Sequence, residues 1–87
     1  MRRRVVVHGR VQGVFFRDTT RRLALEHGVT GWVRNTWVGT VEAVFEGTPE
    51  AVGRLVDFVH RGPPGADVER VEIFAEDEEG LAGFSVR

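Results

Sequence analysis

The sequence predicts an α+β fold in which two helices cover one face of a mainly antiparallel sheet. Three observations predict it. Apolar residues alternate with polar ones in several short segments, they recur at a helical spacing in two others, and each helical segment lies between two strand-like segments. The chain has 87 residues, which is enough for one domain, and we expect residues 1–87 to form it.

In the first half of the chain, a strand, a helix and a hairpin follow one another. Alternating valines predict a strand over about 3–10. From Phe16 the apolar spacing becomes helical and continues for about three turns, until Gly28 supplies a C-terminal cap. Alternation then predicts a pair of strands over 29–34 and 40–46, joined by a turn at 36–39.

The second half repeats the order of a helix and a strand. Thr48, Pro49 and Glu50 are typical of a helix start, because they supply a hydroxyl cap, a proline in the first turn and an early acid. An apolar stripe follows until the Gly-Pro-Pro-Gly run at 62–65 ends the helix. Strand-like alternation returns at 71–75, and a short last strand is predicted at 84–86.

The resulting order is βαββαβ with a short terminal strand. Each βαβ unit requires a right-handed crossover, so both helices lie on the same face of the sheet. This is the ferredoxin-like arrangement, which hosts many functions and selects none of them.

The composition excludes several kinds of chemistry. The chain has no Cys and no Lys, which excludes a thiolate nucleophile, a cysteine metal site, a P-loop lysine and Schiff-base catalysis. It has one Asn, Asn35, and one Gln, Gln12. The net charge is −1, yet residues 1–22 are rich in Arg and residues 67–79 in acids. That asymmetry favours either an anionic partner or two complementary solvated faces.

The arginine-rich start is followed by an apolar run of only three valines, which is too short for a signal peptide. No stretch approaches the length of a membrane span. We therefore expect a cytoplasmic protein without membrane association.

The loop between the first strand and the first helix carries the first candidate site. Gly9 and Gly13 permit positive φ angles, and backbone N–H groups in such a loop, together with a helix N-terminus, can bind an anion. Arg17 lies in the first helical turn, where the helix dipole disfavours a cation. Either an anion sits between them, or Arg17 lies on a solvated helix face beside Asp18 and Arg21.

Asn35 is the second candidate. It shares strand parity with Val33, so it faces the helices near the end of its strand, either as a turn residue or as a side chain presented to a site. Trp32 and Trp37 are expected to pack or to be partly exposed. His8 either ends the first strand or acts as a base. No spacing of His, Asp or Glu indicates a metal site.

Two segments carry a resemblance to a known family. Residues 9–17, Gly-Arg-Val-Gln-Gly-Val-Phe-Phe-Arg, resemble the first signature of the acylphosphatase family. Residues 31–35, Gly-Trp-Val-Arg-Asn, followed by Gly39, Val41 and Gly47, resemble the second. The similarity extends through both βαβ units to the last strand.

This resemblance implies an enzyme that hydrolyses small acyl phosphates to a carboxylate and inorganic phosphate, without metal or cofactor. We also expect the protein to be a monomer. The resemblance implies that Arg17 and Asn35 are catalytic and that inorganic phosphate is a product and a competitive inhibitor. The phosphate cradle it implies consists of backbone amides of the loop, from Gln12, Gly13, Val14, Phe15, Phe16 and Arg17. The Gln12 side chain either contacts substrate or braces the loop.

A carboxylate is a good leaving group, with a conjugate acid of pKa near 4, so the absence of paired acids does not count against this chemistry. Two alternatives remain. An RNA-recognition domain has the same topology and stacks bases on aromatic residues of the open sheet face, but the acids of the fourth strand and the missing aromatic–basic run disfavour it. The other is a related module that binds an anion without catalysis.

Overall fold

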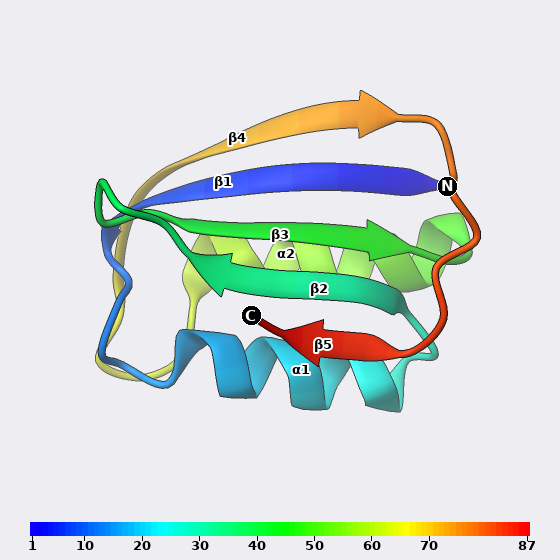
Figure 1. Cartoon of the computed structure of the whole chain (residues 1–87). Coiled ribbons are helices and arrows are strands. Elements are labelled where there is room, and N and C mark those ends of the chain that lie inside the picture. Colours follow the sequence, from blue (N-terminus) through cyan, green and yellow to red (C-terminus); the bar gives the residue numbers. More distant parts are fainter.

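The computed structural model describes all 87 residues and has the predicted order of elements. Five strands form one sheet in the order β4-β1-β3-β2-β5, in which only the β2–β5 pair is parallel. Figure 1 shows both helices on the same side of this sheet. The elements are β1 (Arg2–Arg10), α1 (Phe16–Glu26), β2 (Thr30–Asn35), β3 (Val41–Glu46), α2 (Pro49–Arg61), β4 (Asp67–Glu76) and β5 (Phe84–Val86).

The hydrophobic core fills the space between the helices and one face of the sheet. Alternate residues of β1 and β3 point into it: Val5 pairs with Ala43, Val7 pairs with Val41, and all four side chains are buried. α1 packs against β2 and β5, and α2 packs against β1 and β4. Neither helix is long and apolar enough to cross a bilayer.

The outer face of the sheet carries an ion-pair network centred on β1. Arg2 contacts Glu46 of β3 at 2.8 Å and Glu76 of β4 at 2.9 Å. Arg4 contacts Glu76 at 2.8 Å and Glu42 of β3 at 3.1 Å. The basic start of the chain therefore lies between two strands that carry acids. Arg2 and Arg4 pair with carboxylates of the same chain, so these two charges do not require an anionic partner.

Glu46 joins this network to the segment that leads into β5. Its side chain is only 6% exposed, and besides Arg2 it accepts hydrogen bonds from the backbone N–H groups of Glu79, Gly80 and Leu81 at 2.9–3.1 Å. The bond from the Glu79 amide and the Arg2 guanidinium lower the pKa of Glu46 from 4.5 to about 2. One buried carboxylate therefore fixes the path from the β4 edge of the sheet to the β5 edge.

The structure differs from the sequence prediction mainly in β4, which begins at Asp67 instead of near residue 71. The added residues pair with the end of β1 across an irregularity between His8 and Gly9. Gly9 has φ 127°, and a Cβ there would lie 2.1 Å from the Asp67 carbonyl oxygen, so glycine is needed for this close approach. Residues 67–70 contain one apolar residue, Val68, and it is out of phase with the alternation of Val71 and Ile73, so the pattern did not extend the predicted strand to them.

Glu46→Gln should destabilise the fold at neutral pH by about 3–5 kcal/mol, near the low end because Arg2 keeps Glu76. The folded state lowers the pKa of Glu46, so the carboxylate stabilises fully above pH 4.5 and loses its effect as the pH falls toward 2. Urea unfolding across this range should show the wild type and Glu46→Gln converging at low pH.

The matched control is Glu26→Gln, an exposed carboxylate at the end of α1, which should change stability by less than about 0.5 kcal/mol. A stability difference between wild type and Glu46→Gln that stays constant from neutral pH to pH 2 would contradict the assignment.

Candidate active site

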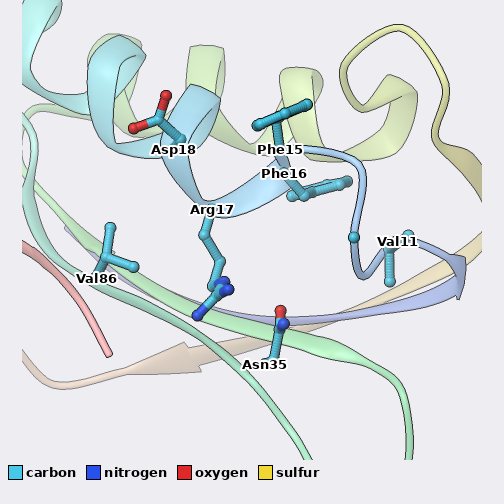
Figure 2. A pocket seen from close by; sticks show the side chains of 8 residues that line it. Val11, Phe15, Phe16, Arg17, Asp18, Asn35 and Val86 are labelled. Carbon is cyan, nitrogen blue, oxygen red and sulfur yellow. The ribbon is translucent and has the colours of Figure 1, made fainter.

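A pocket of about 430 Å³ opens where the loop after β1, the first turn of α1, the end of β2 and the end of β5 meet. Figure 2 shows Arg17 and Asn35 pointing toward each other across it, one from the helix and the other from the sheet. The pocket is lined by Val11, Gly13, Phe15, Phe16, Arg17, Asp18, Asn35 and Val86. The two candidate residues, which are 18 positions apart in sequence, therefore share one cavity.

The loop at this pocket is held in an unusual backbone conformation. Gly13 has φ 74°, and Phe15, immediately before α1, has φ 62° and ψ 26°, the left-handed conformation that a bulky residue rarely adopts. None of the backbone N–H groups of residues 12–15 donates a hydrogen bond to the backbone or to a side chain of the chain. The first backbone bond into α1 runs from Thr19 to the Phe15 carbonyl at 3.1 Å, so the helical N–H groups of residues 16–18 have no intrahelical partner.

The other helix shows how this chain normally begins a helix. α2 is capped by Thr48, whose Oγ1 accepts from the Ala51 N–H at 3.2 Å. α1 has Phe15 at the cap position and no side-chain cap. Because the chain can cap a helix conventionally, the uncapped start of α1 is a local feature of the pocket. Such a row of N–H groups is suited to bind an anion.

Arg17 is half-buried and extends into the pocket, which decides against the solvated position beside Arg21. Its Nη1 donates to the backbone oxygen of Arg87 at 3.3 Å. The end of β5 therefore touches the guanidinium at the pocket edge, and the remaining donors of this planar cation are available to a ligand.

Asn35 is the last residue of β2, so it is a strand residue and not part of the turn. Its Oδ1 is the only buried side-chain nitrogen or oxygen atom in the chain that has no hydrogen-bond partner. An unpartnered buried acceptor is unfavourable, and native structures contain few of them. Its position in a pocket is explained if a bound molecule, such as water, donates a hydrogen bond to Oδ1.

Gln12 does not point its amide into the pocket. Its Nε2 donates to the carbonyl oxygens of Thr36 and Thr40, each at 2.9 Å, at the two ends of the β2–β3 turn. Thr36 and Thr40 also share a hydroxyl contact of 2.6 Å. The side chain thus ties the loop to the strand end that carries Asn35, which is the bracing arrangement considered from the sequence.

The remaining candidates lie outside the pocket. His8 contacts Glu72 at 2.6 Å on the outer face of the sheet. Trp32 is partly buried beneath the guanidinium of Arg87, at 4.6 Å from the ring centroid. Trp37 is fully exposed at the tip of the β2–β3 turn, so the expectation that it packs or is partly exposed was wrong.

Sequence reasoning missed Val86, Arg87 and Asp18 as neighbours of the site. Val86 and Arg87 reach it only because β5 crosses to the far edge of the sheet and pairs with β2, and no local pattern encodes that pairing. Asp18 lines the rim, but Figure 2 shows its carboxylate directed away from Asn35. No group of three or more His, Cys, Asp or Glu side chains is arranged to hold a metal ion.

Comparison with known proteins assigns the family. The family model described as Acylphosphatase matches residues 3–86. The chain belongs to the acylphosphatase family. An acylphosphatase of Rubrobacter xylanophilus is 60% identical over 85 residues, which cover 97% of this chain and 77% of the relative. An acylphosphatase of Gloeobacter violaceus is 54% identical over 86 residues, covering 99% and 92%.

Solved acylphosphatase structures share the fold over nearly the whole chain. The crystal structure of the acylphosphatase from Bacillus subtilis is 34% identical, with a TM-score of 0.94, and the match covers 99% of this chain and 97% of that one. The chain is thus an acylphosphatase of the hydrolase class. Both signature segments of this acylphosphatase, 9–17 and 31–47, contribute residues to the pocket.

Gln12→Glu should loosen the connection between the loop and the turn. A carboxylate of nearly the same shape cannot donate to the Thr36 and Thr40 carbonyls, so the loss of two hydrogen bonds should lower the free energy of unfolding by about 1–3 kcal/mol in urea titration. Trp37→Ala, an exposed change on the same turn, is the control and should cost less than about 0.5 kcal/mol. Equal stability of Gln12→Glu and the wild type would remove Gln12 from this bracing role.

Proposed function

We propose that residues 1–87 act as one acylphosphatase domain that hydrolyses the carboxyl-phosphate bond of small acyl phosphates, with Arg17 and Asn35 as catalytic residues. The observation that carries this proposal is the pairing, across one pocket, of an uncapped row of backbone N–H groups with an unpartnered buried amide oxygen. The N–H groups bind an oxyanion, and the amide oxygen accepts a hydrogen bond from water. This hydrolysis requires both a bound phosphoryl group and a positioned water.

The phosphoryl group binds in the loop. Backbone N–H groups of residues 12–17 and the guanidinium of Arg17 hold its non-bridging oxygens, in a loop whose N–H groups have no hydrogen-bond partner within the chain. Phosphoryl transfer passes through a largely dissociative transition state, in which positioning and charge stabilisation account for most of the catalysis. A preformed cradle that needs no reorganisation supplies both.

Asn35 positions the nucleophile. Its Oδ1 accepts a hydrogen of the attacking water and directs the water oxygen to phosphorus. A bond forms between the water oxygen and phosphorus, the bond between phosphorus and the carboxyl oxygen breaks, and the electron pair leaves with the carboxylate. We infer that a phosphate oxygen takes the proton of the water, because the one carboxylate that lines the pocket, Asp18, is directed away from Asn35. The products are a carboxylate and inorganic phosphate.

The outer face of the sheet does not favour the nucleic-acid alternative. A guanidinium group lies against each of two aromatic rings there: Arg4 lies 4.3 Å from the centroid of Phe74, and Arg87 lies over Trp32. Base stacking would first have to displace these contacts.

Arg17→Ala should reduce both turnover and phosphate affinity. Loss of a charge-assisted contact should weaken competitive inhibition by inorganic phosphate about tenfold to a hundredfold and lower kcat/KM at least as much. Arg21→Ala, which removes the same charge from α1 outside this pocket, is the control and should retain wild-type kinetics. Unchanged phosphate inhibition in Arg17→Ala would exclude Arg17 from the cradle.

Asn35→Ala should lower kcat by about a hundredfold while the inhibition constant of phosphate stays unchanged, because the lost group positions water and not the phosphoryl group. Its Oδ1 has no partner in the fold, so the variant should unfold at the same urea concentration as the wild type or at a higher one. Weakened phosphate inhibition, or a clear loss of stability, would argue against water positioning by Asn35.

The function itself is tested by hydrolysis of benzoyl phosphate and acetyl phosphate by the purified chain. We expect turnover of both, and we expect it to survive exhaustive dialysis against a chelator, because Arg17 and the loop amides supply the stabilising charge. Loss of activity restored by adding a divalent metal would disprove the metal-free mechanism. Phosphate binding without any hydrolysis would instead support the non-catalytic anion-binding module.

A further inference from the structure

Phe15 combines two unfavourable features at the edge of the pocket. Its side chain is 80% exposed, although it is one of the largest apolar groups in the chain. Its backbone also adopts the left-handed conformation at φ 62°, which is strained for a bulky residue. The neighbouring Phe16, only 2% exposed, supplies the aromatic ring that the core uses here.

The loop alone does not explain an aromatic ring at this position. The left-handed conformation is met without strain by glycine, as Gly13 does two residues earlier in the same loop. Strained residues of this kind concentrate at functional sites. Since Phe15 lines the pocket, its ring is placed to contact what the pocket binds.

The geometry of the proposed reaction identifies that contact. In an in-line displacement, the leaving group departs on the side of phosphorus opposite the attacking water. Figure 2 shows Asn35, which would hold the water, at one side of the pocket and Phe15 at the opposite side. The acyl part of the substrate would therefore leave the phosphate toward Phe15.

We propose that the Phe15 ring forms an acyl-group subsite that favours acyl phosphates carrying a flat aromatic group. This inference rests on the proposed function, which fixes the direction in which the acyl group points. The exposed ring offers one face for offset stacking, while a small acyl group such as acetyl reaches too little of it to gain from the contact.

The test compares kcat/KM for benzoyl phosphate and acetyl phosphate. In Phe15→Ala the benzoyl-to-acetyl ratio should fall about threefold to tenfold, the range expected for one aromatic pair, and the ratio cancels any effect of the variant that both substrates share through the phosphate cradle. Phe15→Leu, which keeps apolar bulk without a flat ring, should fall in between. Trp37→Ala, which removes an exposed aromatic ring outside the pocket, should leave the ratio unchanged.

A binding measurement separates this inference from catalysis. Phenacylphosphonate and acetonylphosphonate replace the scissile oxygen of the two substrates by a methylene and cannot be hydrolysed. By calorimetry the wild type should bind the phenacyl compound more tightly, and Phe15→Ala should lose that preference. If the wild type hydrolyses neither acyl phosphate, the proposed function fails. The difference in affinity between the two phosphonates then tests by itself whether Phe15 forms an acyl-group subsite.

Two results would overturn the subsite. One is a benzoyl-to-acetyl ratio, or a phosphonate preference, that is the same in Phe15→Ala and wild type. The other is a parallel loss for both substrates with weakened phosphate inhibition, which would mean that Phe15 acts only through the conformation of the loop.

Discussion

The ion pairs that hold β1 between β3 and β4 are the constraint on which the rest of the structure depends. A slip of one residue in this register would turn Val5 and Val7 outward and Arg2 and Arg4 toward the core. Arg2 and Arg4 each contact an acid on both neighbouring strands, so the charges oppose such a slip from the outer face while the valines oppose it from the inner one. Because the loop of residues 11–15 continues directly from β1, the same register also decides where its N–H groups lie relative to the end of β2.

Stability and activity make opposite demands within a few residues. The core and the sheet follow the ordinary rules, with buried valines, satisfied strands and a capped α2. The pocket breaks several of these rules at once, with a left-handed Phe15, an uncapped helix and the unpartnered oxygen of Asn35. Local departures of this kind are sustained only where the surroundings hold them, and Gln12 supplies part of that support from the loop itself.

Local patterns predicted most of the fold, and the family resemblance selected Arg17 and Asn35, which line one pocket in the structure. The order of elements, the α2 cap and the placement of Arg17 and Asn35 followed from periodicity, parity and the family resemblance, because each depends on neighbours in sequence. Features that depend on distant pairing could not be found this way. Burial of a charged residue such as Glu46 could not be predicted from the sequence, because the backbone N–H groups that stabilise its carboxylate come from the distant segment after β4. The approach of the last strand to the pocket likewise has no local signal.

The strand order has a consequence for the kinetics of folding. Only β2 and β3 are paired through a short turn, whereas β1 pairs with β3 and β4 and β2 pairs with β5 across long stretches of chain. Most of the sheet therefore forms only after large loops have closed, and the entropy of closure must be lost before the contacts compensate for it. Such a chain belongs among the slower-folding small domains. Since the pocket is completed by β5, the last strand of the chain, it should be among the latest parts of the molecule to take shape.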